Sequence, residues 1–144
     1  MEQHVFVIFA SSIQKMLQRI QTIWMLLAVL CAAALFLTSQ DVTLLTGVPI
    51  LPIASVLLIL MGAYSIFNFK NRKRQILLNT ISIIINALLI GLLVYWLLNL
   101  SGGISFPEKG IELVFPTLAI LCLLIANIFI RKDEKLVKSV DRLR

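Results

Sequence analysis

Residues 75–107 read QILLNTISIIINALLIGLLVYWLLNLSGGISFP, which is 33 residues without a single charged side chain. Three further charge-free stretches occupy residues 20–40, 42–69 and 113–130, and the four together hold 100 of the 144 residues. A helix needs roughly 20 residues to cross the hydrocarbon core of a bilayer, which is about 30 Å thick. Each stretch is long enough to do so, and the sequence therefore predicts an integral membrane protein.

The composition excludes most other classes of protein. Apolar residues make up 60% of the chain and charged residues 14%, whereas soluble domains average about 45–50% and 25%. The mean hydropathy is +0.99. These values exclude a disordered chain, a disulfide-rich scaffold and an ordinary soluble globule.

The spans are expected to be helices rather than strands. No segment shows the polar–apolar alternation that a membrane β-barrel requires, and backbone groups in lipid must find their hydrogen-bond partners within the element. We therefore predict an all-α integral membrane four-helix bundle with a cytoplasmic amphipathic C-terminal helix. The transmembrane domain covers residues 20–130, with spans at about residues 20–37, 49–69, 76–100 and 113–130. A cytoplasmic segment (residues 1–19) precedes it, and a basic tail (residues 131–144) follows it.

The basic residues predict the orientation of the spans. Twelve of the thirteen Lys and Arg residues lie in residues 1–19, 70–74 and 131–144, which an even number of spans places on one side. Because Lys and Arg accumulate in cytoplasmic loops, both termini and residues 70–74 are expected on the cytoplasmic side of the membrane. Nucleic acid is not an expected partner, since its binding requires basic residues gathered on one folded face.

Two features of the N-terminal region each allow two interpretations, namely the alanines at the end of the first span and the segment before Met16. The alanines at residues 32–34 follow an apolar core, as in a cleavable signal peptide, but the apolar run continues to Leu37, so we expect an uncleaved span. Residues 1–15 contain an apolar run too short to cross a membrane, and Met16 is a more natural start. Residues 1–15 are therefore interpreted as an upstream extension or as an interfacial segment.

Asn79, Ser82 and Asn86 are polar residues that recur along the third span. Their spacing of i, i+3 and i+7 places them on one face of a helix. That face could form a polar path or a small binding site, or it could hold helices together through hydrogen bonds of about 0.6 kcal/mol each. We favour the second interpretation. The candidate partners are Ser55, Asn68, Thr117 and Asn127.

Small residues four positions apart predict close packing of the helices. The pairs are Ala28 with Ala32, Ala87 with Gly91, and Cys122 with Ala126, and Gly62 and Ala63 are expected to act in the same way. The same pattern is typical of helices that associate with a partner. The expected partners are the lipid bilayer and either another membrane protein or a second copy of the chain.

The sequence offers little material for catalysis. The single histidine is His4, and Cys31 and Cys122 lie inside apolar spans without a neighbouring base, so both thiols are interpreted as packing residues. Glu108 and Glu112 are interpreted as a solvated pair before the fourth span. We therefore expect no catalytic residue, no metal site and no cofactor, and the protein is not expected to be an enzyme.

The C-terminal tail combines basic residues with an apolar stripe at helical spacing. The residues expected to contact a partner or lipid are Leu136, Val140, Leu143, Lys135, Lys138 and Arg142. Six basic against three acidic groups would attract anionic headgroups. The tail is predicted to be a helix, continuous with the fourth span or bent onto the membrane surface, that serves as a topology anchor or as a docking site.

Three parts of the sequence resemble a known family. They are MLQRIQTIW at residues 16–24, Lys70-Asn71-Arg72 with Gln75, and RKDEKLVKS at residues 131–139 followed by DRLR at residues 141–144. Together they are similar to an uncharacterised family of small four-span inner-membrane proteins of Bacteroidetes, catalogued as a domain of unknown function. The resemblance covers residues 16–144. It implies the same architecture, in the inner membrane of a bacterium, and brings no activity, cofactor or catalytic residue.

Two functions of different class follow from the sequence. The first is a small non-enzymatic polytopic membrane protein that packs with or regulates a membrane complex. The second is a minimal transporter or channel subunit with a polar path along Asn79, Ser82 and Asn86. Carriers coupled to protons or ions need ionisable groups inside the bilayer, and the four predicted spans contain no Asp, Glu, Lys, Arg or His. The absence of ionisable residues from the predicted spans favours the first function.

Overall fold

The computed structural model describes residues 2–39, 49–68, 71–99 and 111–142. Within these ranges every regular element is a helix. The helices are α1 (Glu2–Thr38), α2 (Ile50–Phe67), α3 (Arg72–Leu98), the short 3-10 helix η1 (Ile111–Leu113) and α4 (Val114–Arg142). By length and composition, four segments could cross a membrane, namely Arg19–Thr38, Ile50–Phe67, Arg72–Leu98 and Ile111–Ser139. The described chain is therefore all-helical, with four candidate membrane spans, as the sequence predicts.

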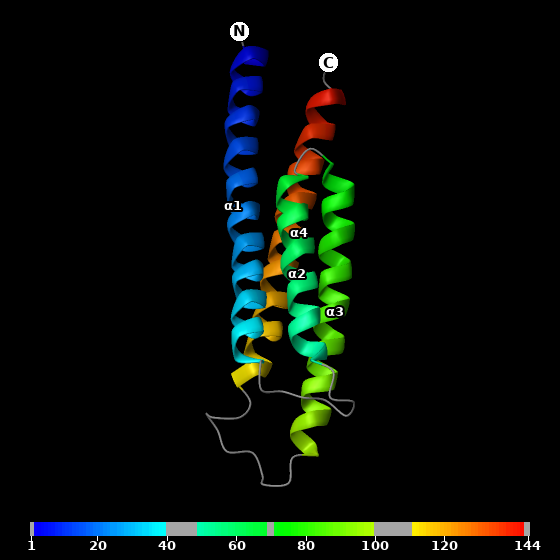
Figure 1. The fold of residues 1–144 in the computed structure, drawn as a ribbon. Coiled ribbons are helices and arrows are strands. Elements are labelled where there is room, and N and C mark those ends of the chain that lie inside the picture. The colour runs from blue at the N-terminus through cyan, green and yellow to red at the C-terminus, as the bar shows by residue number, and fades with distance from the viewer. Residues whose placement is uncertain (1, 40–48, 69–70, 100–110, 143–144) are drawn as a thin grey trace.

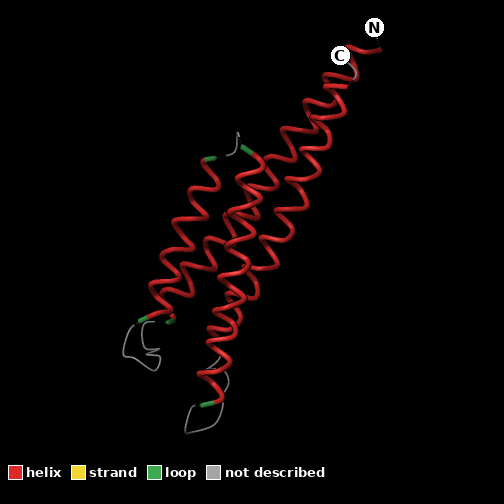
Figure 2. The backbone as a smooth tube through the Cα atoms, turned by 90° about the vertical axis from the view of Figure 1, so that its right-hand side faces the viewer, coloured by secondary structure: helices red, strands yellow, loops and turns green. Residues whose placement is uncertain are grey.

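The four long helices form an elongated bundle in which helices adjacent in sequence also pack together (Figure 1). α1 packs against α2 and, most extensively, against α4, while α3 packs against α2 and α4. The N- and C-termini lie at the same end of the bundle as the start of α3, and we call this end the terminal end. α1 and α4 both extend beyond α2 and α3 there, as the side view in Figure 2 shows.

Two helices are longer than the predicted spans. α1 begins at Glu2 and includes residues 2–15 in one continuous helix, whereas the sequence separates this segment from the first span. α4 continues past the predicted end of the fourth span to Arg142, so the tail continues the span as a helix. Neither addition contains a glycine or proline, the two residues that most strongly interrupt a helix.

The three prolines within the described residues lie where a helix tolerates them. Pro49 is the N-cap of α2, and Pro52 and Pro116 lie in the first turns of α2 and α4. A residue in the first turn has no intrahelical acceptor for its N–H, so the missing N–H of proline costs little there. These prolines therefore help to set where two helices begin.

The interior of the bundle is built from three apolar clusters. Their buried members are Ala32, Leu35, Leu51, Leu58, Leu89 and Leu93 in the first, Met25, Ala126 and Ile130 in the second, and Ala28, Cys122 and Leu123 in the third. The outward faces are apolar as well. Leu30, Leu60, Leu88 and Leu121 are all exposed. A helix that is apolar on all sides is typical of a membrane span.

Two of the three predicted pairs of small residues are buried inside the bundle, and the third pair faces outward. Ala28 and Ala32 of α1, and Cys122 and Ala126 of α4, are buried. Ala87 and Gly91 of α3 are exposed instead. Small-residue spacing alone does not say which side of a helix faces its neighbours, and α3 turns this pair outward.

Replacing Gly62 with alanine tests the close approach of α1 and α2. A Cβ atom at Gly62 would overlap with Cγ2 of Val29, a side chain that is stiff at χ1. We therefore expect Gly62→Ala to lower the free energy of unfolding by roughly 1–3 kcal/mol. The loss of stability is measured by thermal unfolding in detergent, followed through the reaction of a thiol dye with the buried Cys31 and Cys122.

Gly91→Ala is the matched control for this experiment. A Cβ atom at Gly91 meets no atom within 4 Å, so this variant should unfold at or above the temperature of the parent. Equal melting temperatures for the two variants would contradict close packing at Gly62.

Candidate functional site

Polar side chains from all four long helices are buried in the half of the bundle nearest the terminal end. We call them the polar layer, and its members are Gln21 of α1, Ser65 of α2, Gln75 and Asn79 of α3, and Asn127 and Asp133 of α4. Each is at most 7% exposed. A polar group buried in an apolar environment is costly unless it is hydrogen-bonded, so the partners of these residues define the site.

A chain of hydrogen bonds crosses three helices through Asn79. The hydroxyl of Ser65 donates to Oδ1 of Asn79 at 3.1 Å. Nδ2 of Asn79 in turn donates to Oδ1 of Asn127 at 3.0 Å. One side chain of α3 is thereby joined to both α2 and α4.

Gln75 lies one turn before Asn79 and extends these contacts to α1. Its Nε2 donates to the backbone oxygen of Ser65 at 3.3 Å and lies 3.2 Å from Sδ of Met25. The contact with a thioether sulfur is weak, since sulfur is a poor acceptor. Gln75 and Asn79 together connect α3 with each of the other long helices.

The remaining polar residues of the predicted α3 face do not reach another helix. Nδ2 of Asn86 donates to the backbone oxygen of Ser82 at 2.8 Å, within α3 itself. Among the candidate partners, Ser55 donates to the backbone oxygen of Leu51 in its own helix and Thr117 to that of Leu113 in the adjoining η1. Asn68 accepts a long hydrogen bond from Asn71 at 3.4 Å. Of these candidates, Asn127 pairs with the predicted face in the described part of the chain.

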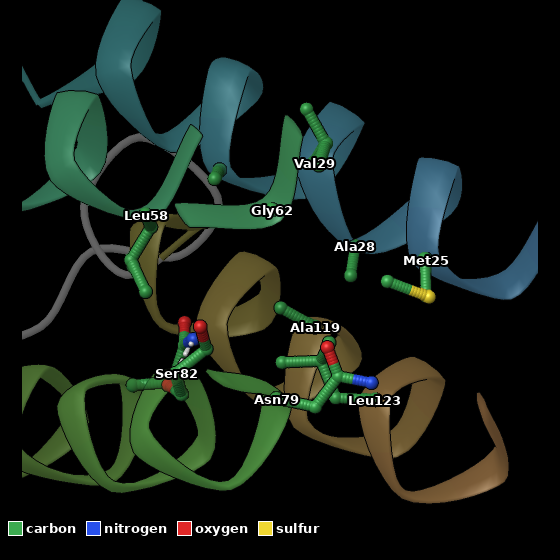
Figure 3. A pocket seen from close by; sticks show the side chains of 11 residues that line it. Met25, Ala28, Val29, Leu58, Gly62, Asn79, Ser82, Ala119 and Leu123 are labelled. Atoms are coloured by element: carbon green, nitrogen blue, oxygen red, sulfur yellow. Dashed lines mark hydrogen bonds between the residues drawn. The ribbon is translucent and has the colours of Figure 1, made fainter. Parts of the chain in front are cut away.

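Asn79, Ser82 and Asn86 nevertheless line one cavity, shown in Figure 3. The other residues around it come from the three other long helices and are Met25, Ala28, Val29, Ala32, Leu58, Gly62, Ala119 and Leu123. The cavity measures about 20 Å³, and a space of roughly 10–15 Å³ by the same measure accommodates one water molecule. The polar face of α3 therefore borders a space for about one water.

A buried ion pair joins the first residue of α3 to α4 at the terminal end. Nη2 of Arg72 lies 3.0 Å from Oδ2 of Asp133, whose side chain is 0% exposed while that of Arg72 is 18% exposed. Neither carboxylate oxygen of Asp133 accepts a hydrogen bond from the described residues. The positive charge of Arg72 is thus the principal compensation for the burial of this carboxylate.

The predicted contact residues of the tail differ in how far the structure describes them. Lys135 and Lys138 are exposed and Leu136 is half-buried. Lys138 also forms an exposed i, i+4 ion pair with Glu134 at 2.9 Å, a contact of small energetic value. The side chains of Val140 and Arg142, and the whole of Leu143, lie outside the described residues.

The residues considered for chemistry are placed as follows. Cys31 and Cys122 are free and buried. Glu112 is buried rather than solvated, while the side chain of His4 and residue Glu108 lie outside the description. The described residues contain no group of three His, Cys, Asp or Glu side chains that could hold a metal ion.

Sequence reasoning missed Gln75 and Asp133 as interior residues, although each leaves a signal. Gln75 continues the spacing of Asn79, Ser82 and Asn86 by one more turn toward the start of α3. Asp133 is an acidic residue in a basic segment that directly follows an apolar span. In the sequence Gln75 directly precedes the predicted third span and Asp133 follows the fourth, so both are expected outside the membrane.

Four helices that are long and apolar enough to cross a bilayer, joined by a buried polar layer, indicate the class of multi-pass helical membrane proteins. The chain belongs to the family described as "Domain of unknown function (DUF4293)", whose model matches residues 38–143. The resemblance to a domain of unknown function is thus confirmed. No curated protein and no solved structure matches the chain.

Replacing Arg72 tests the energetic role of the buried ion pair. Arg72→Gln leaves the carboxylate of Asp133 buried without a counter-charge, so we expect the free energy of unfolding to fall by about 3 kcal/mol. The double variant Arg72→Gln/Asp133→Asn removes both charges and should recover most of that loss. The measurement is unfolding by SDS in mixed micelles.

Glu134→Gln serves as the control, because it breaks the exposed pair with Lys138 and should leave the free energy of unfolding nearly unchanged. If Arg72→Gln is no more destabilised than Glu134→Gln, the pair with Asp133 does not stabilise the bundle.

Proposed function

We propose that this chain is a non-enzymatic multi-pass protein that packs with or regulates another membrane complex. The observation that carries the proposal is the hydrogen-bonded chain through Asn79, whose amide bonds on both sides to Ser65 and Asn127. Ser65, Asn79 and Asn127 hold three helices together through these hydrogen bonds, so the groups that form them are not free to bind a substrate. The cavity beside them has room for about one water, so the surfaces left for interaction are the outer ones.

The proposal includes an orientation with both termini in the cytoplasm of a bacterial cell. Exposed basic residues at the terminal end support it, since such residues accumulate on the cytoplasmic side of a membrane. They are Arg19, Lys73, Arg74, Arg131, Lys132, Lys135 and Lys138. The resemblance to inner-membrane proteins of Bacteroidetes supports the same location.

The proposed contact with a partner is the part of α1 and α4 that extends beyond α2 and α3 (Figures 1 and 2). On α4 this part presents exposed Lys135 and Lys138, while Leu136 and Val137 are half-buried within the chain itself. Asp133 is fully buried beside Arg72 and does not belong to the contact surface. A partner would therefore meet mainly the charged side of α4.

A minimal transporter or channel subunit is the second candidate function. One observation favours it: Asn79, Ser82 and Asn86 line the same cavity. A water molecule in this cavity would form the start of a polar path. The cavity volume of about 20 Å³ is far below that of a typical ligand site, roughly 300–1,000 Å³.

Crosslinking with mass spectrometry in native membranes tests the proposed function. We expect the full chain to crosslink reproducibly to one membrane-protein partner, and a chain that ends at Glu134 to lose this partner. The truncated chain keeps Asp133 and its pair with Arg72, so it should remain folded in the membrane, with a lower melting temperature because it lacks the half-buried Leu136 and Val137. Retention of the partner by the truncated chain would contradict docking through the tail.

Flux measured in vesicles that contain the purified chain separates the two functions. Flux that the parent shows and Asn86→Leu abolishes would favour the transporter subunit over the packing function.

A further inference from the structure

The terminal end carries a set of exposed basic residues that form no ion pair with the described side chains. We call it the basic surface, and its members are Arg19 of α1, Lys73 and Arg74 of α3, and Arg131, Lys132 and Lys135 of α4, all exposed. Two carboxylates are described at this end, and both are already paired: Asp133 with Arg72 and Glu134 with Lys138. Six cations from three helices thus remain on this surface.

The packing of the helices places these cations at similar depth. Met25 of α1 and Ile76 of α3 pack with Ala126 and Ile130 of α4, and the ion pair between Arg72 and Asp133 fixes the same register one turn further out. The basic residues of α1, α3 and α4 therefore lie within about two helical turns of each other along the bundle axis.

That depth corresponds to the headgroup layer of a bilayer. Ile130 is the last residue of the apolar run of α4, and α4 continues through residues 131–142 as a helix. At 1.5 Å per residue, Arg131, Lys132 and Lys135 lie within about 8 Å of Ile130 along the axis. The headgroup region on one side of a bilayer is about 5–8 Å thick, so these three residues reach across it.

Lys132 is directed toward the apolar span rather than away from it. Its Nζ lies 5.7 Å from the centroid of the Phe129 ring, a cation–π contact with a residue one turn nearer the span. None of the described carboxylates forms an ion pair with this ammonium group. A cation held at the boundary between hydrocarbon and headgroups needs an anion at that depth, and the phosphate of a phospholipid lies there.

We propose that the basic surface binds the headgroup of an anionic phospholipid, with Lys132 as the leading contact to the phosphate. The bases of α1 and α3 add positive charge at the same depth from neighbouring helices. The lipid binds to the side of the bundle, and this binding does not depend on a protein partner or on the proposed function.

Quenching of Trp24 by brominated lipids tests the proposal. Trp24 packs with two core clusters near the terminal end, and Trp96→Phe makes it the sole tryptophan of the chain. The full chain with this substitution is placed in vesicles of phosphatidylcholine that contain brominated phosphatidylglycerol or brominated phosphatidylcholine. We expect the anionic lipid to be preferred about fivefold, the effect of one well-placed base, and the preference to shrink in about 1 M salt.

Two matched variants isolate the role of charge. In Arg131→Gln/Lys132→Gln/Lys135→Gln the preference should fall close to one, whereas Arg131→Lys/Lys132→Arg/Lys135→Arg keeps the charges and should keep the preference. If the triple glutamine variant does not fold, as judged by its melting temperature, Lys132→Gln alone should lower the preference severalfold.

Several results would overturn the proposal. One is equal quenching of the parent by both lipids, and another is an unchanged preference in the glutamine variants. Displacement of the lipid by inorganic phosphate at constant ionic strength would show that the surface recognises free phosphate instead. Loss of a crosslinked protein partner in the triple glutamine variant, with the lipid preference intact, would assign the surface to that protein.

Discussion

The hydrogen bonds that Asn79 makes to Ser65 and Asn127 are the interaction on which the arrangement of the bundle depends. Helices in lipid gain little from the hydrophobic effect when they associate, because the lipid is as apolar as their side chains. Directional polar contacts and close packing of small residues then decide which faces meet. Asn79 fixes α3 between α2 and α4, and the approach of Gly62 to Val29 fixes α2 against α1.

The ion pair between Arg72 and Asp133 closes the same bundle at its terminal end. Just before Asp133 the character of α4 changes, from an apolar run that ends at Ile130 to exposed bases that begin at Arg131. In the interior, Ser65, Asn79 and Asn127 join three helices through hydrogen bonds, and the exposed charges outside it are the groups that we propose to bind lipids and partners. This division is the physical basis of the function and of the lipid site proposed above.

Much of this architecture could be predicted from the sequence, because the charge-free stretches set the number of long helices. The shared face of Asn79, Ser82 and Asn86 also follows from spacing, and all three are buried. Their partners could not be predicted. Spacing gives the face of a helix but not its neighbour, so Asn79 bonds across the bundle while Asn86 bonds within α3.

The pairing of Asp133 was hidden for a related reason. In the sequence it belongs to a basic tail, and only the register between α3 and α4 brings it to Arg72. The outward position of Ala87 and Gly91 likewise depends on the rotation of α3, which its polar contacts set. In each of these instances the missing information was the position of one helix relative to another, which spacing along the sequence does not contain.

A double-mutant cycle of Asn79→Ala and Asn127→Ala, measured by SDS unfolding in mixed micelles, tests the central role of the polar layer most directly. The hydrogen bond between these side chains should appear as a coupling free energy of about 0.6 kcal/mol, with an upper limit near 1.7 kcal/mol. The matched cycle of Asn86→Ala with Asn127→Ala should give no coupling, because Asn86 bonds to its own helix. Zero coupling between Asn79 and Asn127 would contradict the account.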